Sequence, residues 1–160
     1  MPTKVTFSCE ETMEMTSLEI AKQILDIENW SDFKGYGFLP GIKSARFDPR
    51  TPEVIGSKIH VTNCDNSSHI EEIVEWSPDS RLRLHFSQFS APVSYLATGF
   101  DEIWEFERIG TQTKVVRSME LHCKSFLTWP ILKVISILLK KALSQHLVQI
   151  KNNSAGTNQK

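Results

Sequence analysis

The segment ILKVISILLKKALSQHLVQIK, residues 131–151, has the residue spacing of one long amphipathic helix. At about 100° per residue, its apolar positions gather in one broad stripe, while Lys133, Lys140, Ser144 and Lys151 gather on the opposite side. The stripe consists of Leu132, Leu138, Ile131, Ala142, Ile135, Leu139, Ile150, Leu143 and Leu147. A stripe this wide needs an apolar partner, so we expect the helix to lie across a sheet.

Three apolar residues and one histidine of this segment depart from the pattern. Val134, Ile137 and Val148 fall on or near the polar side, which predicts that a loop or a second copy of the chain, in a homodimer, covers part of the helix. His146 falls within the apolar stripe. It is either a core histidine bonded to a backbone carbonyl or a polar contact that faces a cavity, because a buried histidine without a partner is costly.

The first forty residues predict a strand, a helix or helix pair, and a loop. Residues 4–9, KVTFSC, alternate in the manner of a strand. Thr16 or Ser17 then caps a helix, and a short second helix is expected over residues 30–34. Residues 35–41, GYGFLPG, predict an irregular loop, whose glycines would permit movement near the mouth of a cavity.

From residue 42 onward the apolar period changes to two. Six alternating segments follow one another with links that are mostly rich in turn residues, which is typical of an antiparallel meander. They are IKSARF (42–47), GSKIHVTN (56–63), HIEEIVEW (69–76), RLRLHF (81–86), TGFDEIWEFE (98–107) and TKVVRSMELHC (113–123). With residues 4–9 they predict an α+β fold, in which a curved antiparallel sheet of about seven strands wraps around the long C-terminal helix. We expect one domain over residues 1–152 and a disordered tail over residues 153–160.

The composition excludes several classes of protein. The 160 residues, 40% apolar and 23% charged, suit one globular domain. A net charge of −1 with acids and bases mixed along the chain predicts no attraction to nucleic acid or to an anionic membrane. The start of the chain lacks the features of a secretory signal, so we expect a cytoplasmic protein. The longest apolar run, residues 126–139, is shorter than the ~20 residues of a transmembrane segment.

Metal, disulfide and cofactor motifs do not occur in the sequence. Cys9, Cys64 and Cys123 form an odd set without metal spacing, so we expect reduced, buried thiols. The histidines do not have the spacing of a zinc site, and the sequence contains no dinucleotide, phosphate-loop, zinc-protease or serine-hydrolase motif. We therefore expect neither a metal nor a cofactor.

Three segments of the chain resemble the START-like or Bet v 1-like superfamily, in particular its polyketide cyclase and dehydrase branch. Residues 24–47 are similar to the family's helix-Asp-x-x-x-Trp start with the following loop and strand. Residues 54–86 are similar to its glycine-led strand and Glu-x-Ile-x-Glu-aromatic-x-Pro hairpin, although the usual Pro-Pro is Pro78-Asp79 here. The third similar segment is the terminal helix after a long strand pair that contains tryptophan.

This resemblance covers nearly the whole chain, but its motifs are structural. It implies a helix-grip fold whose cavity, between sheet and helix, holds a hydrophobic ligand such as a lipid, a hormone or a polyketide. A minority of the family are catalysts, and they differ in the residues that they use. The resemblance therefore assigns no catalytic residue.

Alternation along the strands separates the side chains that face a cavity from those that face outward. On residues 70–76 we prefer the face of Glu72, Val74 and Trp76, because the opposite face would bury Ile73 between two glutamates. The candidate ligand-binding residues are Trp30, Phe38, Glu72, Val74, Trp76, Leu84, Phe86, Glu102, Trp104, Arg117, Met119, Leu139, Leu143 and His146.

Charged residues on the inner face allow two interpretations. Arg117 and Glu102 form a structural ion pair at the edge of the cavity, since buried charges are usually paired. Alternatively Arg117, Glu102 or Glu72 anchors the polar end of a ligand, or acts as a general acid or base.

Three functions fit these observations. The first is the binding or carriage of a small hydrophobic molecule, which is lipid-like, polyketide-like or aromatic, in the cavity. The second is an enzyme of the cyclase, dehydrase or hydrolase type that uses acid-base residues of the same cavity. The third is a protein-interaction module like the co-chaperone members of this fold, which the apolar residues Val134, Ile137 and Val148 favour.

Overall fold

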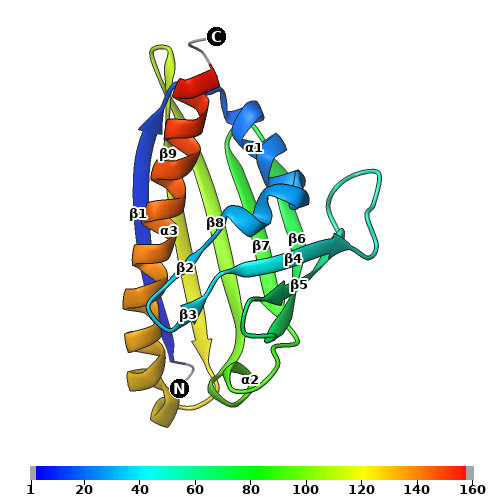
Figure 1. Ribbon diagram of the computed structural model, residues 1–160, viewed down its shortest axis with the longest axis vertical. Helices are drawn as coiled ribbons and strands as arrows, with labels where there is room; N and C mark the ends of the chain where they lie inside the picture. Colours follow the sequence, from blue (N-terminus) through cyan, green and yellow to red (C-terminus); the bar gives the residue numbers. More distant parts are fainter. Residues whose placement is uncertain (1–2, 158–160) are drawn as a thin grey trace.

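The computed structural model, which describes residues 3–157, contains one seven-stranded antiparallel sheet that curves around a long helix (Figure 1). The order of strands across the sheet is β1-β9-β8-β7-β6-β5-β4. The strands are β1 (Lys4–Met13), β4 (Ile42–Phe47), β5 (Lys58–Asn63), β6 (Ser68–Ser77), β7 (Arg81–Ser87), β8 (Ala97–Ile109) and β9 (Gln112–Cys123). All seven predicted strands are present, and the α+β helix-grip architecture is confirmed.

Helices close the sheet on its concave side. Thr16 caps the first of them: its hydroxyl accepts a hydrogen bond from the backbone amide of Glu19, whose carboxylate accepts one from the backbone amide of Thr16. A short 3₁₀ helix replaces the second helix expected over residues 30–34. The helical elements are α1 (Ser17–Leu25), η1 (Ile27–Asp32), α2 (Val93–Leu96), η2 (Phe126–Thr128) and α3 (Trp129–Thr157).

The segment predicted as an irregular loop over residues 35–41 is a small hairpin of β2 (Gly35–Tyr36) and β3 (Leu39–Pro40). Gly35 has a φ of 73°, and a Cβ added there would lie 2.2 Å from the carbonyl oxygen of Leu39. A Cβ on Gly41 would lie 2.7 Å from the carbonyl oxygen of Phe33. These two glycines allow backbones to approach closely, whereas the sequence had suggested a role in movement.

The first strand of the chain pairs with the last one. Lys4 of β1 lies opposite His122 of β9, and Met13 lies opposite Thr113. This pairing makes β1 an edge of the sheet and places it directly under α3 (Figure 1). Strands β4 to β9 follow one another as the predicted meander.

The stripe of α3 packs on the sheet largely as predicted. Leu132, Leu143 and Leu147 are each at most 2% exposed. Ile131, which we assigned to the stripe, is 51% exposed although Leu132 beside it is fully buried, so the covered side of the helix is narrower than the stripe in its first turn. Ser136 is buried instead, and its hydroxyl donates to the carbonyl oxygen of Lys133. Within residues 3–157, none of the helices combines the length and the apolar character needed to cross a bilayer.

The predicted disordered tail over residues 153–160 is wrong for its first part. Helix α3 continues to Thr157, and the hydroxyl of Ser154 donates to the carbonyl oxygen of Lys151. Extending an existing helix by a turn needs no new nucleus, so the polar composition of these residues did not end it. Residues 158–160 lie outside the described residues.

Strand β6 contains the main departure from the sequence prediction. Its pairing with β7 shifts between Ile73 and Glu75, so Val74 occupies a bulge. Before the bulge Glu71 and Ile73 face inward, and after it Trp76 faces inward opposite Leu82. The preferred face is therefore wrong for Glu72 and for Val74, which is 39% exposed. One extra residue changes which side chains face the core.

The three cysteines are free thiols. Cys9 is buried and its pKa is raised by that burial, and Cys123 is half-buried. Cys64 is exposed, so the prediction of a buried thiol is wrong there; it lies in the turn between β5 and β6.

Candidate functional site

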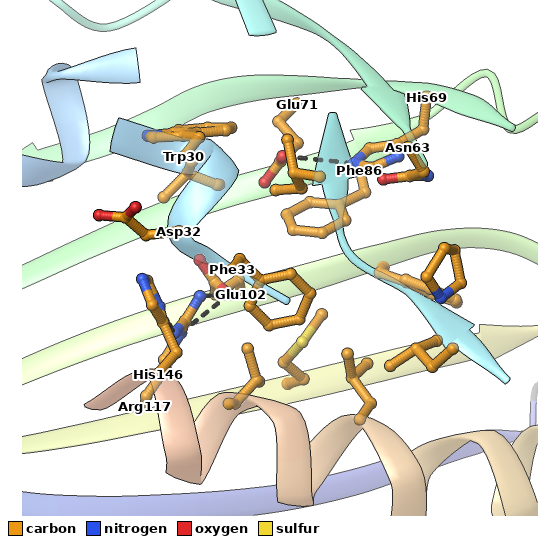
Figure 2. A pocket seen from close by; sticks show the side chains of 18 of the residues that line it. Trp30, Asp32, Phe33, Asn63, His69, Glu71, Phe86, Glu102, Arg117 and His146 are labelled. Atoms are coloured by element: carbon orange, nitrogen blue, oxygen red, sulfur yellow. Dashed lines mark hydrogen bonds and ion pairs between the residues drawn. The ribbon is translucent and has the colours of Figure 1, made fainter. Parts of the chain in front are cut away.

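A cavity of about 620 Å³ lies between the concave face of the sheet, α3, η1 and the β2-β3 hairpin. Its walls are mostly apolar, with Phe33 and Trp30 from η1, Phe86 from β7, and Leu139 and Leu143 from α3. Figure 2 shows these walls and the polar side chains among them. A volume of this size and such a lining are typical of a small-molecule site.

The first polar group of the cavity is an ion pair between neighbouring strands. Arg117 of β9 donates to one oxygen of Glu102 of β8, with Nε 3.1 Å and Nη2 2.9 Å from Oε2. The other oxygen of Glu102 accepts from the indole Nε1 of Trp104 at 2.8 Å. The Arg117 guanidinium also lies over the Trp104 ring, 4.3 Å from its centroid. The two charges therefore neutralise each other inside the wall.

His146 extends this network from α3. Its Nδ1 lies 3.0 Å from Nη1 of Arg117, and its ring stands edge-on to Phe33 at 5.8 Å between centroids. Burial and the charge of Arg117 lower the pKa of His146 to about 3, so the imidazole is neutral. Because a guanidinium only donates, Nδ1 must accept and Nε2 must carry the hydrogen. Figure 2 shows the second ring nitrogen turned away from Arg117, where it can donate to a ligand.

The second polar group lies on β6, at a distance from the first across the sheet (Figure 2). Glu71 is 4% exposed, and its Oε2 lies 3.2 Å from Nε2 of His69. The His69 ring stacks on Phe86, with 5.2 Å between centroids. Burial raises the pKa of Glu71, and the hydrogen bond with His69 offsets only part of that shift. The cavity thus favours the protonated form of this carboxyl.

Most of the predicted site residues are brought together by the fold. Eleven of them line the cavity: Trp30, Phe38, Leu84, Phe86, Glu102, Trp104, Arg117, Met119, Leu139, Leu143 and His146. Glu72, Val74 and Trp76 do not line it, because the bulge in β6 turns the first two outward and Trp76 packs elsewhere on the core. Of the two interpretations of His146, the contact that faces a cavity fits the structure.

Solved structures of similar shape were found for almost the whole chain. A protein from Thermus thermophilus is 13% identical, with a TM-score of 0.70 over 96% of this chain and 99% of that one. A START superfamily protein from Mycobacterium smegmatis is 12% identical, with a TM-score of 0.63 over 91% of this chain and 98% of that one. The chain has the START-like helix-grip fold.

Norcoclaurine synthase from Thalictrum flavum has the same helix-grip architecture. It is 9% identical, with a TM-score of 0.65 over 92% of this chain and 88% of that one. No family model and no curated protein matches the sequence.

The helix-grip site also contains residues that the sequence did not identify. Glu71 and His69 were missed because the bulge in β6 leaves no clear mark on the sequence. Asp32, on η1, lines the cavity on the side of His146 (Figure 2). Phe89, from the loop after β7, and Phe100 pack against each other in its wall, 4.7 Å apart between centroids. The short alternating runs predict strand faces but not these loop residues.

Two histidines meet on the outer face of the helix-grip sheet. The carboxylate of Asp101 on β8 lies 3.0 Å from His85 and 2.8 Å from His122, and Arg83 lies 3.4 Å from the same carboxylate. Glu120 lies beside them. One carboxylate oxygen of Glu120, one of Asp101 and a ring nitrogen of His122 lie within 4.8 Å of one another, as the ligands of a metal ion would. Sequence spacing gave no sign of this convergence. The guanidinium beside Asp101 supplies a cation, so we interpret the cluster as a structural network.

Proposed function

We propose that this protein binds a small, largely apolar molecule in the cavity between the sheet and α3. The observation that supports the proposal is a cavity of about 620 Å³ whose mostly apolar walls hold two buried polar groups, one around Arg117 and one at Glu71. Apolar walls supply affinity at about 25 cal/mol per Å² buried, and the polar groups orient the ligand.

The polar groups favour a neutral ligand with hydrogen-bond acceptors. Arg117 and Glu102 already neutralise each other, so a charged ligand would be buried without a free counter-charge there. The Nε2–H of neutral His146 is a donor, and the carboxyl of Glu71, whose pKa is raised by burial, is a second one when it holds its proton. A carbonyl, hydroxyl or ether oxygen on the ligand would satisfy either. Aromatic and polyketide-like molecules carry such groups on an apolar frame, and lipid-like ones carry them at one end.

A solved structure of the same fold supports an aromatic ligand. Norcoclaurine synthase from Thalictrum flavum was solved in complex with dopamine and hydroxybenzaldehyde. The aromatic rings in the present cavity, Trp30, Phe33, Phe86, Phe89 and Phe100, would stack against a ligand of that kind.

An enzymatic reaction is the second candidate, and Glu71 is the observation that favours it. A buried carboxyl with a raised pKa, next to a histidine, is suited to give a proton to a bound substrate. Such chemistry would belong to the cyclase, dehydrase or hydrolase type. Loss of turnover in Glu71→Gln, with ligand binding retained, would separate this function from simple binding.

Binding is tested with the neutral dye Nile red and with a variant in which a larger side chain partly fills the cavity. Leu139→Trp places an indole inside the cavity, whereas Val134→Trp places it on the exposed side of the same helix, where the native side chain is 52% exposed. We expect Leu139→Trp to weaken Nile red binding at least about tenfold, a loss of about 1.4 kcal/mol, and Val134→Trp to leave it unchanged. Native mass spectrometry of protein purified from its host should show a bound small molecule in the wild type and in Val134→Trp, and not in Leu139→Trp. Equal binding of Nile red by both variants would refute the proposal.

A further inference from the structure

The surface at the end of the molecule that holds α2 and η2 carries several exposed apolar side chains. Tyr95 of α2 is 70% exposed, Phe126 and Leu127 of η2 are 73% and 72% exposed, and Ile131 of α3 is 51% exposed. We call these four residues the apolar tip. The backbone amide of Lys124, just before η2, donates to the carbonyl oxygen of Leu96 at the end of α2. The apolar tip therefore combines two segments far apart in the sequence, α2 and the start of α3, which lie at the same end of the molecule (Figure 1).

Charge is distributed unevenly around the apolar tip. Residues 124–133, which carry Phe126, Leu127 and Ile131, contain Lys124 and Lys133 and no Asp or Glu. Residues 88–100, which include α2, also contain no acidic residue. The net charge of −1, which argued against an anionic membrane, therefore hides a local excess of lysine over acidic residues in the segments that carry the apolar tip.

We propose that the apolar tip, with Lys124 and Lys133, docks on the surface of an anionic lipid bilayer. Aromatic and aliphatic side chains flanked by lysines are the combination that inserts into the headgroup region, because the apolar groups enter the lipid while the ammonium groups meet lipid phosphates. A second copy of the chain fits less well, since a symmetric contact at this end would bring lysines against lysines.

The docking surface lies next to the cavity. Val93 and Leu96 of α2 line the cavity, whereas Tyr95 between them points to solvent. One four-residue helix therefore separates the bilayer from the cavity. Docking itself does not depend on what the cavity holds. The inference that α2 is the route by which an apolar ligand passes between bilayer and cavity rests on the proposed function.

The test is flotation of the protein with lipid vesicles. We compare vesicles of phosphatidylcholine alone with vesicles that also contain phosphatidylserine, at low and at high salt. We expect binding to the anionic vesicles only, weakened by salt. Phe126→Ser/Leu127→Ser should abolish it, and Lys133→Glu should lower it at least about fivefold. Both changes lie at exposed positions, so folding is retained.

Matched controls come from the opposite end of the molecule. Ile109, 47% exposed, lies beside the β8-β9 turn, and Lys22 lies on α1 (Figure 1). Ile109→Ser and Lys22→Glu should bind the anionic vesicles as the wild type does.

Failure of the wild type to float, equal binding to neutral vesicles, or equal losses in the control variants would each overturn the proposal. So would a dimer in solution that Phe126→Ser/Leu127→Ser dissociates, because a second copy would then cover the tip. A Leu139→Trp variant that still floats but no longer binds Nile red would separate docking from the proposed function.

Discussion

Arg117 donates both its Nε and its Nη2 to a single oxygen of Glu102, at 3.1 and 2.9 Å. The remaining oxygen of Glu102 accepts from Trp104, and Nη1 of Arg117 lies 3.0 Å from His146. The side chains of Arg117 and Glu102 are only 8% and 6% exposed. The pair is thus buried, and each charge is compensated by the other rather than by water.

Removing one partner of this unit should destabilise the protein strongly. Arg117→Met leaves the Glu102 carboxylate buried without a cation, and we expect a loss of about 3–5 kcal/mol in the free energy of unfolding. The double variant Arg117→Met/Glu102→Gln should lose much less than the sum of the single losses. Urea denaturation measures all three. As a control, Lys4→Met breaks an exposed pair with Glu120 and should cost less than about 1 kcal/mol. Additive losses would contradict the coupling.

His146 should make the protein less stable as the pH falls. The unfolded chain binds a proton at this histidine near its ordinary pKa of 6.5, whereas the folded chain does so only near its lowered pKa of about 3. Stability is therefore complete above pH 6.5 and is lost progressively toward pH 3. In His146→Asn the amide oxygen can still accept from Arg117, and this part of the pH dependence should disappear. An unchanged slope in that variant, or an imidazole that titrates near pH 6.5 by NMR, would contradict this assignment.

Glu71 should produce the opposite pH dependence. Burial raises its pKa above the ordinary value of 4.5, so the folded chain keeps a proton that the unfolded chain loses. The contribution of Glu71 to stability is complete below pH 4.5 and is lost as the pH rises through the pKa of the folded state. Glu71→Gln cannot ionise and should be the more stable protein at neutral pH. Glu72→Gln, one residue further and facing outward, serves as the control; equal pH profiles for the two variants would argue against a buried Glu71.

The β2-β3 hairpin should depend on Gly35. In Gly35→Ala the new Cβ would meet the carbonyl oxygen of Leu39 at 2.2 Å, in addition to the strain of a φ of 73°. Gly110→Ala has a similar φ of 61° and no atom within 4 Å of its Cβ, so it should cost only about 1–2 kcal/mol. We expect a clearly larger loss of unfolding free energy in Gly35→Ala, together with weaker Nile red binding, because Phe38 and Leu39 line the cavity. Equal losses in the two variants would mean that the hairpin relaxes freely.

The sequence predicted the architecture because its apolar residues recur at the regular spacing of strands and of a helix. Alternation places Leu82 and Leu84 on one face of β7, and the helical spacing of Leu132, Leu143 and Leu147 marks the covered side of α3. These patterns arise from burial, which is what forms the fold.

The candidate site was predicted less completely, for two physical reasons. A bulge adds one residue to a strand and has no characteristic amino-acid composition. The sequence therefore did not show the change of face at Val74, and Glu71 and His69 were not recognised as site residues. The interaction of His146 with Arg117 joins residues from α3 and β9 that are 29 positions apart, and only the relative placement of helix and sheet decides it. Alternation shows which side chains point inward but not which of them meet.

The pairing of β1 with β9 has a consequence for biosynthesis. While the ribosome is still translating the chain, Lys4–Met13 emerges before the other strands of the sheet but has no partner until Gln112–Cys123 has followed it. The sheet therefore cannot close before its last strand has been synthesised, and until then an unpaired, half-apolar strand is available to chaperones and to other nascent chains.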